Sequence, residues 1–298
     1  MPPSARRTGA FDTTSIFIGS SGPRDQIIPV RGASAGNGCD VGVAATAVAL
    51  RTGDFGYNWS MTSVVLIHGA YNELWGPHEL AARWIPALQD GLWHVGSTIH
   101  SSDISICFYG DLFRHDPEAV DSGHWTSTRA GVEDTLVETV GHDTLDTLTQ
   151  LAGRQTYERT VDMFTSMAVD PSLADRVRQR LIDLLDDTRI LVAHSLGTVI
   201  AHQVLVAHPE IAVGTLLTLG SPLGSPPFTT DGEWPGRTER WVNVVALTDP
   251  VAQPGRVPDR FGSRVEERLI DNGHRGHHPE PYLNSRAVGD VVAAALAT

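Results

Sequence analysis

Residues 189–199 combine an expected strand, a tight turn and an expected helix around a single serine. They read R-I-L-V-A-H-S-L-G-T-V: the apolar residues 190–192 indicate a buried strand, and an apolar helical pattern covers 199–206. Ser195 stands at the apex of the turn between them. A serine hydroxyl attacks a carbonyl carbon only when a neighbouring base takes its proton, so this chemistry also requires a histidine and an acid from elsewhere in the chain.

The turn around Ser195 resembles the nucleophile elbow G-x-S-x-G of the α/β-hydrolase superfamily, in its lipase and esterase branch. Ala193 stands where the first glycine is usual, and Gly197 provides the second. Both positions must be small because strand and helix pass close together there, and alanine adds only a methyl group. The resemblance covers residues 61–298 and implies a mostly parallel central sheet flanked by helices.

The resemblance also implies that an acid and then a histidine follow the serine along the chain. Asp249 comes directly after the apolar strand expected at 241–247, and its surroundings N-V-V-A-L-T-D-P-V resemble the acid loop of lipase-like hydrolases. Asp271, after the last expected strand at 265–270, is the alternative acid.

Three histidines compete for the role of the base. The segment D-N-G-H-R-G-H-H contains His274, His277 and His278. In similar hydrolases the histidine shortly precedes a Tyr-Leu pair, which here is Tyr282 and Leu283 and favours His277. The same three histidines could hold a metal ion on one face of a helix, but the glycines among them oppose a helix, so no metal site is expected.

The oxyanion of an acyl-transfer intermediate needs backbone N–H donors. The resemblance assigns them to Ala70, in the turn H-G-A-Y that follows the expected strand 63–67, and to Leu196. Tyr71 of the same turn is a candidate substrate contact. His68 and His194 are expected to brace the turns beside the site rather than to transfer protons.

Regular alternation of strands and helices begins near Met61 and predicts an α/β domain over residues 61–298. Residues 1–60 show no sustained periodicity and are interpreted as an accessory segment or as upstream sequence. Residues 112–187 are too long for a simple crossover and contain several helical patterns, which predicts a helical lid. Four of its side chains are candidates to line an apolar substrate pocket, with mutual packing of the helices as the alternative: Trp125, Met163, Phe164 and Met167.

Composition limits the classes of partner. The chain has 22 Lys plus Arg against 35 Asp plus Glu, a formal net charge of -13, which disfavours nucleic acid and stable membrane association. Its two cysteines, Cys39 and Cys107, have no metal-ligand spacing, and Cys107 is interpreted as a core residue. No long apolar run suggests a membrane span, so a cytoplasmic protein of unspecified oligomeric state is expected.

The resemblance to the α/β-hydrolase superfamily implies a cofactor-free serine hydrolase that acts on a small-molecule or acyl substrate, a carboxylic ester or a thioester. An acyltransferase or thioesterase of a biosynthetic pathway would use the same three residues with a different acceptor. A catalytically silent hydrolase fold that binds a ligand is the third possibility.

Overall fold

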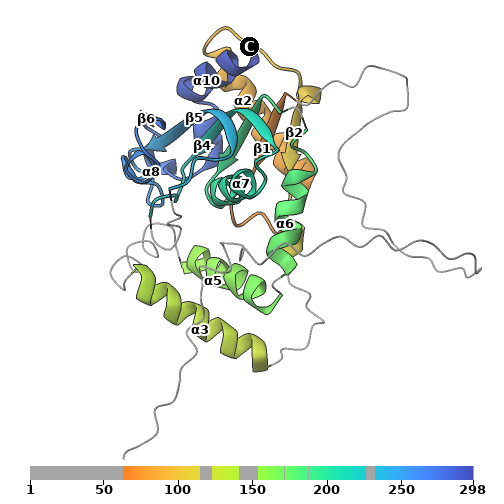
Figure 1. Ribbon diagram of the computed structural model, residues 1–298, viewed down its shortest axis with the longest axis vertical. Helices are drawn as coiled ribbons and strands as arrows, with labels where there is room; N and C mark the ends of the chain where they lie inside the picture. The colour runs from red at the N-terminus through yellow and green to blue at the C-terminus, as the bar shows by residue number, and fades with distance from the viewer. Residues whose placement is uncertain are drawn as a thin grey trace, which may run out of the picture.

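The computed structural model describes residues 63–114, 123–140, 154–170, 172–186, 188–225 and 232–297. The accessory segment 1–60 lies outside these ranges. Within them, the chain forms a central sheet with helices on both faces (Figure 1). This confirms the expected α/β class.

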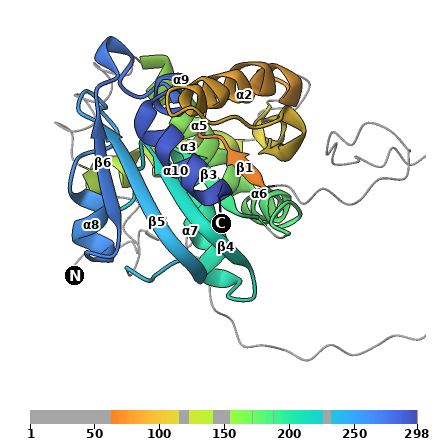
Figure 2. The ribbon, with the colours of Figure 1, turned by 90° about the horizontal axis from the view of Figure 1, so that it is seen from above.

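The sheet is parallel throughout its described strands, in the order β2-β1-β3-β4-β5-β6. Figure 2 shows β6 at one side of the sheet and β1 towards the other. The strands are β1 (Val64–Ile67), β2 (Ile104–Cys107), β3 (Ile190–His194), β4 (Ala212–Leu219), β5 (Arg237–Ala246) and β6 (Glu266–Ile270).

β1 is apolar along its whole length because helices cover both faces of the sheet. β1 reads V-V-L-I and all four residues are buried. Its side chains alternate between the two faces: Val65 and Ile67 join one core cluster, and Val64 and Leu66 join the other. Cys107 is buried in the first cluster, as predicted.

Two sets of helices supply the other half of each core. One face is covered by α2 (Pro77–Trp93), α9 (Pro279–Leu283) and α10 (Arg286–Leu296). The other is covered by α6 (Ser172–Ile182), α7 (Leu196–Ala207) and α8 (Arg256–Phe261). Pro77 opens α2, where its fixed φ suits the first turn. Within the described ranges, no helix is both long and apolar enough to cross a membrane.

The predicted lid region contains two helices that pair with each other, α3 (Gly123–Val140) and α5 (Arg154–Val169), and both lie below the sheet in Figure 1. Arg129 of α3 joins them by donating to Asp162 of α5 at 2.9 Å and to Glu158. The third helix, α6, buries Leu173 and Leu181 in the core beside α7. Helix α6 therefore belongs, with α7, to the helices that cover this face of the sheet. A separate lid over residues 112–187 stays a prediction.

The strand order places a topological switch point at β1, because the chain moves from β1 outwards to β2 and then returns to β3 on the other side. In open parallel sheets, ligands bind outside the carboxyl ends of the strands at such a point. The loops after β1 and β3 carry the H-G-A-Y turn and Ser195. The topology thus brings together two sequence motifs that lie more than a hundred residues apart.

The approach of α7 to β1 depends on Gly197. A Cβ at this position would lie 2.6 Å from the carbonyl oxygen of His68 and 2.8 Å from that of Ile67, and backbone cannot move aside as a side chain can. We expect Gly197→Ala to lower the free energy of unfolding by about 1–3 kcal/mol in chemical denaturation. Gly76→Ser is the control, because a Cβ there meets nothing within 4 Å. Equal losses for the two variants would contradict the close approach.

Candidate active site

Ser195 occupies a strained backbone conformation between β3 and α7. Its φ is 53° and its ψ is -126°, and the only other described non-glycine residue with positive φ is Tyr71. Such strain persists only where the surroundings hold it. The Ser195 N–H donates to the carbonyl of Leu219 at 3.0 Å, and the Thr198 hydroxyl donates to the Ser195 carbonyl at 2.7 Å. The sharp turn required of an elbow is therefore present.

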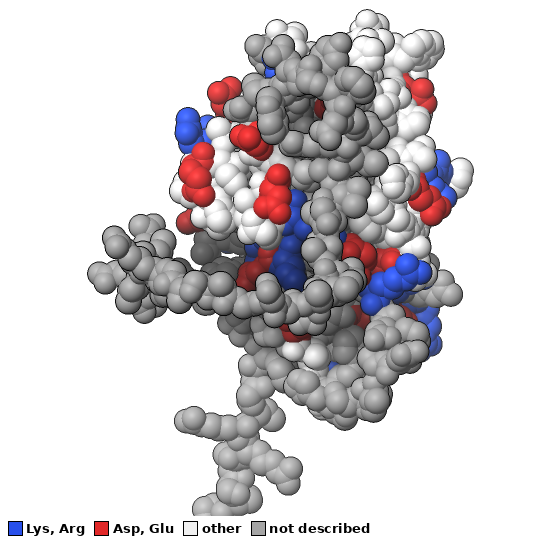
Figure 3. All heavy atoms as spheres, turned by 90° about the vertical axis from the view of Figure 1, so that its right-hand side faces the viewer, with Lys and Arg blue, Asp and Glu red and all other residues white. Residues whose placement is uncertain are grey.

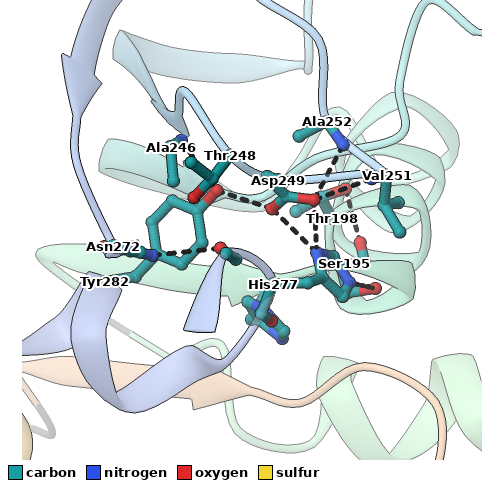
Figure 4. Close-up of polar contacts among 12 residues, drawn as sticks. Ser195, Thr198, Ala246, Thr248, Asp249, Val251, Ala252, Asn272, His277 and Tyr282 are labelled. Carbon is teal, nitrogen blue, oxygen red and sulfur yellow. Dashed lines mark hydrogen bonds and ion pairs between the residues drawn. The ribbon is translucent and has the colours of Figure 1, made fainter. Parts of the chain in front are cut away.

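His277 bridges the serine and the buried carboxylate of Asp249 (Figure 4). Its Nε2 lies 2.8 Å from Ser195 Oγ, and its Nδ1 lies 2.9 Å and 2.8 Å from the two carboxylate oxygens. Because a carboxylate only accepts, Nδ1 carries the proton and Nε2 is free to accept from the serine hydroxyl. This is the arrangement in which histidine can act as a base towards serine.

Asp249 is held as a buried anion. Its side chain has no exposed surface, and it accepts hydrogen bonds from the N–H of Val251 at 2.7 Å and of Ala252 at 3.1 Å. Burial by itself raises the pKa of Asp249, but hydrogen bonds from His277, Tyr282 and Val251 outweigh it and bring the pKa below its usual range. The carboxylate is thus charged at neutral pH and can stabilise a positive imidazolium.

Tyr282 is the further partner of this carboxylate. Its hydroxyl donates to Asp249 at 2.6 Å and accepts from the N–H of Ala246 at 2.9 Å. Burial and the charge of Asp249 raise the pKa of Tyr282 well above its usual range, so it stays a donor. In the sequence Tyr282 only marked the position of the histidine. Its contact with Asp249 depends on how α9 packs, which no local pattern reveals.

His194, the last residue of β3, fixes the backbone of His277. Its Nε2 lies 3.0 Å from the carbonyl oxygen of His277, and a neutral ring donates its N–H there. Burial, followed by the proximity of the His277 ring, lowers the pKa of His194 to about 3. His194 is therefore a neutral brace, consistent with the role expected for it.

The turn after β1 is braced in the same way by His68. The N–H of Tyr109 donates to His68 Nε2 at 3.1 Å, so Nδ1 carries the proton and donates to the Gly69 carbonyl at 2.6 Å. Burial lowers the pKa of His68 to about 4, which keeps the ring neutral. The side-chain amide of Asn72 donates to the carbonyls of Gly69 and Ala70 at 3.1 and 3.0 Å. These bonds point the carbonyls of the turn inwards and hold its shape.

The other candidate acid and bases lie outside this arrangement. Asp271 is exposed and accepts from the N–H of Gly273 at 2.8 Å, and both His274 and His278 are exposed. A Cβ on Gly276 would lie 2.3 Å from the Thr248 carbonyl. The histidine loop, residues 271–278, therefore packs directly on the segment after β5 that carries Asp249. This contact puts His277, rather than its neighbours, beside the carboxylate.

The candidate substrate contacts divide into three groups. Tyr71 and Met163 line a cavity of about 810 Å³ beside the turn after β1. Met167 is buried in the core and borders a small hollow that Leu196 also borders. The side chains of Trp125 and Phe164 lie outside the described residues, so an apolar pocket built from all four lid side chains stays a prediction. In the described ranges, no three His, Cys, Asp or Glu side chains gather as a metal site would require.

No protein-family model matches the chain, and neither does any curated protein. Among solved structures, it is similar to a proposed hydrolase of the α/β superfamily from Xanthomonas campestris pv. campestris, with 17% identity, coverage of 78% of this chain and 98% of that one, and a TM-score of 0.38. It is also similar to an α/β serine hydrolase homologue from Coxiella burnetii, with 13% identity, coverage of 79% and 85%, and a TM-score of 0.34. The chain's own sheet order and elbow geometry carry the assignment of its fold.

Removal of the Tyr282 hydroxyl tests its hold on Asp249. A hydrogen bond to a charged group contributes about 1.5–3 kcal/mol to stability. Without this bond Asp249 should orient His277 less well, and the hydroxyl of Ser195 should react more slowly. We expect Tyr282→Phe to slow the labelling of Ser195 by a fluorophosphonate about tenfold, which corresponds to roughly 1.4 kcal/mol. If Tyr282→Phe lost stability but was labelled at the wild-type rate, the hydroxyl of Tyr282 would contribute to folding and not to the orientation of His277.

The buried neutral histidines predict a pH dependence of stability. The pKa of His194 is about 3 in the folded chain against 6.5 otherwise, so the unfolded state binds an extra proton as the pH falls below about 6.5. The stabilisation is complete above that pH and declines towards pH 3, by up to about 1.4 kcal/mol per pH unit. His194→Gln, which keeps an N–H for the His277 carbonyl, should flatten the decline of the unfolding free energy between pH 7 and 5.

Exposed His278 offers the matched control for this measurement. Urea denaturation of His278→Gln should give the wild-type slope with pH. Identical slopes for the wild type and His194→Gln would contradict the burial of a neutral ring at position 194.

Proposed function

We propose that this chain, which has the α/β-hydrolase fold, is a serine hydrolase that cleaves a carboxylic ester or thioester through an acyl-enzyme on Ser195. The observation that carries the proposal is the unbroken chain of hydrogen bonds from Ser195 Oγ through His277 to Asp249, with 2.8 Å from Oγ to Nε2 and 2.8 Å from Nδ1 to Oδ2. It lies at the carboxyl end of a parallel sheet, on a strained turn. That is where this fold presents its nucleophile.

The first step forms the bond between Ser195 Oγ and the carbonyl carbon. His277 Nε2 removes the hydroxyl proton as the oxygen attacks, and the electron pair of the carbonyl π bond moves to its oxygen. The imidazolium that results carries a positive charge next to Asp249. The buried carboxylate stabilises this charge and holds the ring in the required orientation.

The oxyanion is assigned to the backbone N–H groups of Ala70 and Leu196. Leu196 is the first residue of α7, so its N–H is one of the unsatisfied donors at a helix N-terminus, where the helix dipole favours negative charge. Ala70 belongs to the turn that His68 and Asn72 hold by hydrogen bonds to its carbonyls. Rigid donors of this kind stabilise the transition state without reorganisation.

Collapse of the tetrahedral intermediate breaks the bond to the leaving group. His277 gives its proton to the departing alcohol or thiol, which leaves an ester between Ser195 and the acyl group. Water then enters on the side that the leaving group has vacated, His277 removes its proton, and the same steps release the acid. The substrate is a small molecule or another acyl donor, and the reaction as drawn uses no cofactor.

Replacement of the nucleophile tests the proposal. The wild type should hydrolyse p-nitrophenyl acetate and be labelled by a fluorophosphonate at Ser195, identified by mass spectrometry of the labelled peptide. Ser195→Ala should abolish the labelling and lower kcat by about 10⁴-fold or more. Ser263→Ala, which removes an exposed hydroxyl, is the matched control and should behave as the wild type. Unchanged hydrolysis in Ser195→Ala, or a wild type that the probe never labels, would refute the proposal.

A further inference from the structure

A cavity of about 810 Å³ lies between the turn after β1 and the helices α5 and α6. This volume falls in the range of sites that enclose a ligand of drug size. Gly69 and Ala70 line it, and Gly69 also lies against the nucleophile, since a Cβ built there would be 2.7 Å from Ser195 Cβ. The cavity therefore begins next to the reacting carbonyl of the proposed hydrolysis.

The position of His277 identifies the part of the substrate that the cavity receives. His277 must protonate the leaving group, so the leaving group lies on the His277 side of the carbonyl. The described residues that line the cavity belong to the turn after β1, the segment after β2, α5 and α6, and neither His277 nor Ser195 is among them. The cavity is reached from Ser195 past Gly69, on the side of the turn after β1, and is therefore assigned to the acyl group.

Apart from the neutral ring of His68, the buried part of the cavity wall is apolar. Tyr109 is 1% exposed, Met163 7% and Leu173 3%, and each comes from a different segment of the chain. Leu112 and Phe113 pack against the same core cluster. An acyl group in the cavity would bury apolar surface against these side chains, at about 25 cal/mol per Å² removed from water.

The outer part of the wall contains two ion pairs and two further charged side chains, Arg114 and Asp162. Arg159 of α5 pairs with Glu73 at 3.3 Å, and Arg176 of α6 pairs with Asp170 at 2.8 Å; the two arginine side chains are 41% and 53% exposed. Figure 3 shows basic and acidic groups interspersed around a hollow on this side of the molecule, rather than gathered by sign. Since each guanidinium has five N–H donors and its partner several lone pairs, the pairs keep unused hydrogen-bonding capacity without a net charge.

We propose that this cavity selects an amphipathic acyl group, with apolar surface for the buried wall and neutral hydrogen-bonding groups, such as hydroxyls or amides, for the two ion pairs. A plain hydrocarbon chain would remove water from Arg159 and Arg176 and return no hydrogen bonds. An acyl group that ends in a carboxylate would lose its water on entry and would meet three acidic and three basic side chains in the wall, so no net attraction offsets the loss. The inference names the substrate class of the proposed hydrolase and rests on that function.

The test compares p-nitrophenyl esters that share a leaving group and differ in the acyl chain. Acetate is the reference because it is too short to reach the ion pairs. The longer esters are octanoate, a chain of equal length that ends in a hydroxyl, and one that ends in a carboxylate. We expect kcat/KM for the hydroxyl-ended ester to exceed that of both other long esters by about threefold to tenfold.

Two variants connect this preference to the cavity. Arg159→Met and Arg176→Met should each reduce the preference for the hydroxyl-ended ester, measured as the ratio of its kcat/KM to that of acetate. Arg176→Met is the cleaner of the two, because Arg159 also contacts Glu73 in the loop that follows the oxyanion turn. Arg240→Met removes a comparable pair with Glu266 on the strands β5 and β6, away from the cavity, and should keep the wild-type preference.

The outcomes separate the two proposals. Equal kcat/KM values for the three long esters, or a preference that survives both cavity variants, would overturn the assignment of the cavity while acetate hydrolysis and probe labelling still supported the hydrolase. Absence of both acetate hydrolysis and labelling would overturn the hydrolase, and the acyl cavity with it.

Discussion

The buried carboxylate of Asp249 is the constraint on which the site depends. A charge without solvent access is stable only when hydrogen bonds replace its water, and here they come from three separate parts of the chain: the loop after β5, the histidine loop and α9. Each bond that satisfies the anion also fixes the element that donates it. The hydrogen bonds to this one carboxylate therefore hold three segments together at the carboxyl end of the sheet, and they orient His277.

Features that depend on neighbouring residues could be predicted from this sequence, and features that depend on contacts between distant segments could not. The elbow was predictable because every requirement is local: an apolar strand, small residues on either side and a helix, all within residues 189–207. The place of Asp249 in this chain of hydrogen bonds was predictable because Asp249 directly follows an apolar strand. The fold class follows from the alternation of such strands with helices, and the parallel six-stranded sheet confirms it.

The register of the histidine was open because it depends on a contact between distant segments. Nothing within D-N-G-H-R-G-H-H distinguishes His277 from His278, whereas the packing of Gly276 against the Thr248 carbonyl does. The lid residues illustrate a related limit. Met163 and Met167 lie one helical turn apart with similar side chains, yet Met163 lines the large cavity and Met167 does not. Helical periodicity identifies a buried face and cannot tell which neighbour covers it.

His194 adds a consequence for how this chain can vary. It is the residue before Ser195, and it holds the main-chain carbonyl of His277. Because His194 adjoins Ser195, this hydrogen bond ties the position of His277 directly to that of Ser195, in addition to the loop that carries His277. Exchanges of the exposed residues His274 and Arg275 leave in place both this hydrogen bond and the packing of Gly276 on the Thr248 carbonyl. These two positions are accordingly where the sequence of the loop can diverge while His277 keeps its distance from Ser195.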